Sequence, residues 1–166
     1  MGGFVIKDLF DVKHLKVYHT RQLEEAETGL AYVTRGRFNN GLKCYVRDSS
    51  KLVHNPAGVI SFGAEGSTFF YQAEEYVSGR DMYYLDTRAI SEMACLFLVA
   101  CLSTIVDKYS YTNGMFPDKI RNEYIMLPVT ADGKPDWDYM DGYMRGVMVR
   151  QAHVVEHLME MCVRRY

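Results

Sequence analysis

Two patterns in the sequence place metal-binding side chains at spacings that hydrolases use. His153-Val-Val-Glu-His157 matches an H-x-x-E-H pattern, in which two histidines one helical turn apart can bind zinc. Pro117-Asp118 followed by Asp132-Gly-Lys134 matches a PD…D-x-K spacing. In nucleases with that spacing, paired carboxylates bind Mg²⁺ and the lysine orients the attacking water. Both patterns raise the hypothesis of a metal-dependent hydrolase.

Neither pattern has the context that such chemistry needs. The histidine pair has no evident third ligand, and histidines on a helix surface often occur at this spacing by chance. The Asp132-Gly-Lys134 segment is a turn before Pro135, whereas the nuclease arrangement needs a strand. A Gly-rich methyl-donor loop and an Asn/Asp-Pro-Pro-aromatic tetrapeptide are also absent. We therefore predict a protein that is not an enzyme and uses neither metal nor cofactor. The four cysteines form no CxxC pair and are expected to stay reduced: Cys44, Cys95, Cys101 and Cys162.

A polar turn after the first predicted strand is the main candidate for DNA contacts. Arginine can donate two hydrogen bonds to guanine and asparagine can pair with adenine in the major groove, while any basic residue can bind phosphate. The alternative is a solvated turn, because asparagine tolerates the backbone angles of turns. The candidate residues of this turn are Arg35, Arg37, Asn39, Asn40 and Lys43.

Two further segments could contact DNA. In Gly63–Thr68, backbone amides and the hydroxyls of Ser67 and Thr68 could bind a phosphate, although Glu65 would repel it and a plain hairpin hinge is the alternative. The loop that follows the central helix is polar and aromatic, and a simple helix-exit loop is its alternative. Its candidate residues are Tyr111, Thr112, Asn113, Lys119 and Arg121.

Composition is that of an ordinary globular chain. The 166 residues are 48% hydrophobic and carry a formal net charge of −2. Basic residues outnumber acidic ones in residues 1–53, and residues 54–110 are acidic, so we expect a DNA-facing surface in the first third. The sequence has no signal-peptide pattern and its longest apolar run is too short for a bilayer, so we expect a soluble, cytoplasmic protein without membrane contact.

The pattern of apolar residues predicts several short strands and one helix that is buried against a sheet. The helix spans Ser91–Val106, is apolar almost all round, and has Ser91 as its N-cap. The strands are predicted from β-branched and aromatic runs bounded by turn residues. They are Leu30–Thr34, Leu42–Val46, Val59–Phe62, Ser67–Tyr71, a strand within Glu75–Tyr84 around Met82–Leu85, and Tyr124–Val129.

A long helix of coiled-coil character is predicted after Asp136. Apolar residues recur every three and four positions, which is typical of a coiled coil, and Gln151 in this series could fix the register. An amphipathic helix packed on its own domain is the alternative. We expect one domain at 1–135 and a separate helix at 136–166. The heptad seam comprises Trp137, Met140, Met144, Val147, Gln151, Val154, Leu158 and Met161.

Three stretches, in this order, resemble the specificity (S) subunits of type I restriction-modification systems. They are Tyr32–Gly41 with its Asn-Asn-Gly turn, Val59–Tyr71 with the following Tyr76–Asp81, and Lys119–Pro128 running into Asp136–Met140. The resemblance covers nearly the whole chain. It implies an α+β (mixed α/β) recognition domain at 1–135, with a twisted, mostly antiparallel sheet and a buried helix. This domain would bind double-stranded DNA and direct a methyltransferase subunit, with or without a restriction subunit, to its target. The helix at 136–166 would be a dimerisation or spacer helix.

The sequence departs from the family in one respect. An S subunit has two recognition domains and two long helices, whereas this sequence has one of each. A half-size subunit that forms a homodimer, a fragment and a remnant are the alternatives. A different functional hypothesis is an inhibitory protein-interaction module, which would bind the methyltransferase without binding DNA.

Overall fold

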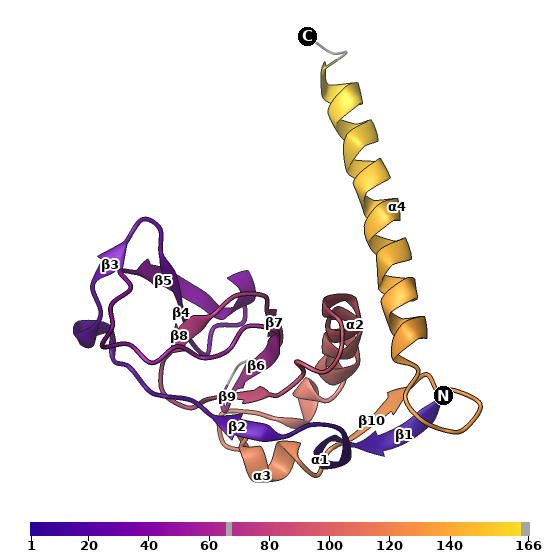
Figure 1. Ribbon diagram of the computed structural model, residues 1–166, viewed down its shortest axis with the longest axis horizontal. Helices are drawn as coiled ribbons and strands as arrows, with labels where there is room; N and C mark the ends of the chain where they lie inside the picture. The colour runs from indigo at the N-terminus through magenta and orange to yellow at the C-terminus, as the bar shows by residue number, and fades with distance from the viewer. Residues whose placement is uncertain (66–67, 164–166) are drawn as a thin grey trace.

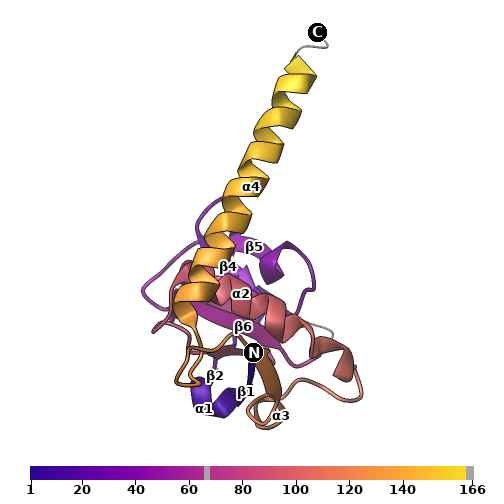
Figure 2. The ribbon, with the colours of Figure 1, turned by 90° about the vertical axis from the view of Figure 1, so that its right-hand side faces the viewer.

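The computed structural model describes residues 1–65 and 68–163, and it has the predicted α+β architecture (Figure 1). The strands of this described part form three small sheets rather than one continuous sheet. Helix α2 (Glu92–Ser103) covers the central sheet, and helix α4 (Trp137–Val163) projects from the body of the molecule (Figures 1 and 2). None of the helices over the described residues is both long and apolar enough to cross a membrane.

The central sheet is antiparallel and contains the largest part of the core. Its strand order is β2 (Val12–His14), β9 (Met82–Leu85), β6 (Val59–Gly63) and β7 (Phe69–Gln72). Helix α2 packs on this sheet through Leu98 and Leu102, which are fully buried. The hydroxyl of Ser91 accepts a hydrogen bond from the Ala94 amide at 3.1 Å, so the predicted N-cap is confirmed.

A second sheet lies beside the first, in the order β3 (Glu25–Ala26), β5 (Leu42–Val46), β4 (Leu30–Val33) and β8 (Tyr76–Ser78). The strands β4 and β8 are parallel, and the other pairs are antiparallel. The segment Glu75–Tyr84 contributes a strand to each sheet. Asp81, with a φ of 56°, lies between β8 and β9 and turns the chain from one sheet to the other.

The third sheet joins the two ends of the recognition domain. β1 (Gly2–Val5) pairs antiparallel with β10 (Tyr124–Leu127). The short helices α1 (Ile6–Leu9) and α3 (Pro117–Ile120) lie next to these strands in the chain, and Ile6 and Ile120 enter the main core. Short 3₁₀ turns lie at Thr20–Gln22, Asn39–Gly41 and Val106–Lys108.

Helix α4 has two parts with different surroundings. Met140 is fully buried in the main core, and the Trp137 ring lies 5.9 Å from the Phe10 ring. From Met148 to Cys162 every residue is exposed, and this part extends away from the domain (Figures 1 and 2). The alternative of a helix packed on its own domain therefore holds for the first turns of α4. Trp137 and Met140 contact the domain itself, unlike the prediction that they face a partner helix, because α2 already covers their side of α4.

Candidate nucleic-acid interface

The predicted Arg35–Lys43 turn is held in a specific conformation. Asn39, Asn40 and Gly41 have φ values of 51°, 54° and 74°, which are left-handed angles that asparagine and glycine accept best. The side-chain amide of Asn40 donates to the Tyr71 carbonyl at 2.9 Å. Asn40 therefore has the backbone role of the alternative interpretation, and its amide already has a partner within the domain.

Arg35 and Arg37 differ in their charge environment. Arg35 Nη1 lies 2.7 Å from a Glu65 carboxylate oxygen and 3.4 Å from an Asp81 carboxylate oxygen, and its side chain is only 25% exposed. Arg37 is exposed and forms no ion pair within the part of the chain that the structure describes. Arg37 is consequently the arginine of this turn whose guanidinium is available to a phosphate or a base.

The loop after α2 meets the same region. The amide of Met115 donates to the Ala64 carbonyl at 2.6 Å, which joins this loop to the end of β6. A small cavity of about 200 Å³ between the loops is lined by Arg37 and Tyr111 among others. Together with the Arg35–Glu65 ion pair, these contacts bring the three predicted DNA-contacting segments together on one surface, which we call the loop face: residues 35–43, 63–65 and 109–115.

A carboxylate stabilises the start of the third segment. Glu123 accepts hydrogen bonds from the Lys108 ammonium at 2.6 Å and from the Tyr109 hydroxyl at 2.7 Å. Partial burial opposes ionisation of Glu123, but these two bonds outweigh it and lower its pKa. Burial, assisted by the bond to Glu123, raises the pKa of Tyr109. The phenol therefore stays protonated and keeps donating, which fixes the loop that follows.

The other predicted contact residues have different surroundings. Tyr111 is 79% exposed, and Thr112 is exposed beside it. Asn113 bonds to the Lys108 carbonyl and to the Lys119 ammonium, and Arg121 donates to the Val12 carbonyl at 3.0 Å, so these three side chains already have partners.

Three more residues belong to these predicted segments. Lys43 donates to the Thr20 hydroxyl at 3.1 Å. Thr68 is half-buried, and Ser67 lies outside the described residues.

Phe38 is a feature of the loop face that the sequence analysis did not single out. Its side chain is 85% exposed, the highest exposure among the large hydrophobic residues that the structure describes. The signal was present in Arg35-Gly-Arg-Phe-Asn-Asn-Gly41, because an aromatic residue at the centre of a polar turn has no core to enter.

The residues of the two hydrolase patterns lie on exposed surfaces. His153 and His157 are on the projecting part of α4, where His153 lies 3.5 Å from Glu156. Asp118 is 95% exposed on α3 and pairs with Arg121 at 3.5 Å. Asp132 pairs with Lys134 at 2.8 Å inside a turn where Gly133 has a φ of 80°. No group of three or more potential metal ligands occurs within residues 1–65 and 68–163.

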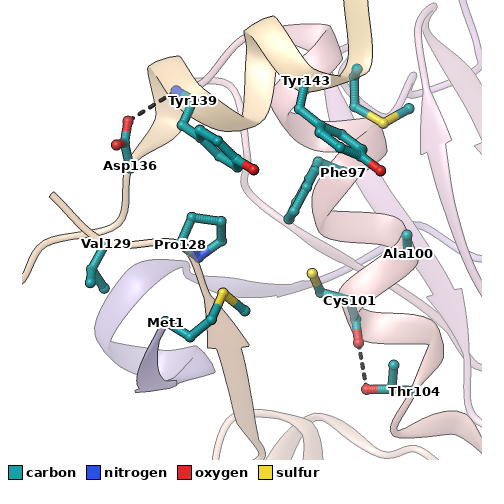
Figure 3. Close-up of a pocket in the computed structure, with 11 residues that line it drawn as sticks. Met1, Phe97, Ala100, Cys101, Thr104, Pro128, Val129, Asp136, Tyr139 and Tyr143 are labelled. Carbon is teal, nitrogen blue, oxygen red and sulfur yellow. Dashed lines mark hydrogen bonds between the residues drawn. The ribbon is translucent and has the colours of Figure 1, made fainter. Parts of the chain in front are cut away.

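An apolar groove lies where α4 leaves the domain (Figure 3). It has a volume of about 680 Å³ and lies between α2, the end of β10 and the first turns of α4. Tyr139 and Tyr143 line it and stack on one another with their ring centroids 6.3 Å apart. Tyr143 also meets the Phe97 ring of α2 edge-on at 5.6 Å, which holds the base of α4 against the domain.

The comparisons with known proteins agree with this architecture. The family model of the type I restriction modification DNA specificity domain matches residues 3–153. A curated relative, the type II restriction enzyme BgcI specificity subunit S.BcgI of Heyndrickxia coagulans, is 26% identical over 147 residues, covering 87% of this chain and 43% of the relative.

Solved structures of low sequence identity have the same fold. The S subunit of a type I restriction-modification system from M. genitalium matches 98% of this chain with a TM-score of 0.63 and 13% identity. A structure of a type I R-M system, described for its complex assembly and conformational transition, matches 96% with a TM-score of 0.66 and 14% identity. The chain spans 43% and 41% of these two proteins, less than half of their lengths.

The chain therefore belongs to the family of type I restriction modification DNA specificity domains. Membership of this family makes it a specificity module rather than an enzyme, as the sequence predicted. It also favours DNA recognition over the inhibitory alternative. The fold class inferred from the resemblance is confirmed by the likeness to S-subunit structures.

Proposed function

We propose that this domain binds a specific double-stranded DNA sequence through the loop face and directs a methyltransferase subunit, and a restriction subunit where one is present, to that site. The observation that carries the proposal is the convergence of three separate loops on one surface, with Arg37 and Tyr111 at its centre. Loops held by a rigid scaffold are where binding residues concentrate. We expect this DNA binding to take place in the cytoplasm.

The exposed part of α4 supports a second element of the proposal, a homodimer. Val154, Leu158 and Met161 of the heptad seam are 51%, 49% and 45% exposed, and Gln151 precedes them on the same side. A row of exposed apolar side chains on a projecting helix favours pairing with a second helix. A twofold dimer would present two identical loop faces, so the target would be a palindrome with a fixed spacer.

Selection of bound sequences from a pool of random duplexes tests DNA recognition. The full chain is used alone and with a co-expressed methyltransferase subunit. We expect one bipartite sequence to be enriched and the methyltransferase to co-purify. A pool that stays random under both conditions would contradict the proposal, and binding of the methyltransferase without DNA would support the inhibitory alternative.

Replacing Arg37 with alanine is expected to weaken binding to the selected duplex about tenfold or more, because it removes a guanidinium that has no ion-pair partner among the described residues. If Arg37 binds a phosphate, the slope of log K against log salt concentration should also fall by about one. Fluorescence anisotropy at several salt concentrations measures both quantities.

The matched control is Lys134→Ala. It removes one positive charge from an exposed side chain in the turn between β10 and α4, away from the loop face. Its affinity should stay within about twofold of the original protein. If Arg37→Ala and Lys134→Ala lose equal amounts of DNA affinity, net charge and not the loop face controls DNA binding.

A further inference from the structure

The exposed side chain of Phe38 indicates that this residue contacts a binding partner. A phenylalanine ring that is 85% exposed leaves its apolar surface in water, and burying that surface against an apolar partner would be favourable. Its turn is part of the polar loop face, and the neighbouring Arg37 forms no ion pair within residues 1–65 and 68–163. This combination of an apolar ring and a neighbouring cation matches a ligand that has both apolar surface and negative charge.

The turn holds Phe38 rigidly, through a network that reaches into the central sheet. The Phe38 carbonyl accepts from the Gly41 amide at 3.0 Å, and the Thr34 amide donates to the Gly41 carbonyl at 2.8 Å. Gln72 donates to the Asn40 carbonyl at 3.2 Å and to the Ser61 hydroxyl at 2.9 Å.

Gln72 is 6% exposed and Ser61 is fully buried. Burying polar side chains is unfavourable unless they are bonded. Here the side chain of Gln72 bonds both to Ser61 and to the Asn40 carbonyl of the Phe38 turn, so this buried pair helps to define the conformation of the turn.

We infer that Phe38 is an apolar wedge that inserts between stacked base pairs of the bound duplex. The inference rests on the proposed DNA binding. Arg37 would bind the adjacent phosphate or base edge, while the ring partly unstacks one base step and bends the duplex. Proteins that bend DNA insert phenylalanine, leucine or methionine in this way. Because pyrimidine–purine steps unstack most easily, the wedge would contribute to sequence selection at a step where no hydrogen bond is made.

The experiment places 2-aminopurine, whose fluorescence rises when it is unstacked, at successive positions of the duplex selected from the random pool. With the full chain we expect a rise at one base step per half-site. Phe38→Ala should abolish that rise and weaken binding about tenfold, and Phe38→Leu should retain most of both because leucine can also unstack a step. Asn40→Gly keeps the left-handed backbone but removes the bond to Tyr71, so it should reduce the rise while Phe38 is still present.

The control is Tyr139→Ala, which removes a 54% exposed ring at the base of α4 and should leave the fluorescence unchanged. Thermal unfolding of each variant verifies that the domain is intact. A selected duplex that shows no fluorescence rise, or a rise that persists in Phe38→Ala, would overturn the wedge and leave DNA recognition standing. A Phe38→Ala variant that binds DNA normally but no longer binds the methyltransferase subunit would also overturn the wedge. Failure to select any duplex would overturn both the wedge and the proposed DNA recognition.

Discussion

Replacing Met140 with alanine is expected to lower the free energy of unfolding by about 2–5 kcal/mol, a large share of the about 5–15 kcal/mol that stabilises a typical domain. Met140 is fully buried where α4 meets α2 and the main core, so the smaller side chain leaves a cavity in that core. Chemical denaturation of the full chain measures the change.

Met148→Ala provides the matched control on the same helix. Met148 is 51% exposed, two turns further along α4, and its replacement should change the unfolding free energy by no more than about 0.5 kcal/mol. If Met140→Ala lowers the free energy of unfolding no more than Met148→Ala does, the first turns of α4 do not belong to the domain core.

This result bears on the boundary between the two parts of the chain. The prediction divides the chain at residue 135, where turn chemistry ends and the heptad seam begins. In the structure, a division there separates Trp137 and Met140 from the core that they complete. Removal of everything after Pro135 would therefore destabilise the recognition domain as well as remove the helix. Substitutions in the exposed part of α4 test the role of the helix without that complication.

The local elements of the fold could be predicted because their signals are local. Leu42–Val46 is a strand with the predicted bounds, and α2 begins after Ser91 because a serine at that position can accept from the third residue of the helix. The division of the strands into two four-stranded sheets could not be predicted. It depends on the turn at Asp81 and on the parallel pairing of β4 with β8, which connects residues about 45 positions apart.

The candidate interface was predictable in outline only. The three segments were identified from polar and turn residues, and the structure brings them together. The sequence alone could not reveal which side chains already have an ion-pair or hydrogen-bond partner within the domain. Arg35 and Arg37 have the same chemistry, yet the fold places Glu65 beside Arg35, from a segment thirty residues away. Asn40 is similarly bonded to Tyr71, whereas Phe38 lacks a core to enter.

The largest effect on function is expected from Val154→Asp in the exposed seam of α4. Val154 is 51% exposed in the single chain and would be buried between the helices of the proposed homodimer, where a carboxylate would be desolvated without a partner. The variant should have the mass of one chain, 19.1 kDa, in light scattering at concentrations where the original protein has twice that mass. Because two linked half-site contacts bind about 10²–10⁴-fold more tightly than one, its affinity for the bipartite duplex should fall at least about 100-fold.

Val149→Asp is the matched control, since it introduces the same charge on the same helix. Val149 is 57% exposed and lies about 140° around the helix from Val154, at about 100° per residue, so a partner on the seam would not cover it. This variant should remain dimeric and keep its affinity. If the original protein already has the mass of one chain at micromolar concentration, the homodimer is wrong, because two seams that attract one another should pair there. If Val154→Asp and Val149→Asp both lose affinity for the duplex while remaining dimeric, the helix acts through its charge and not through the apolar seam.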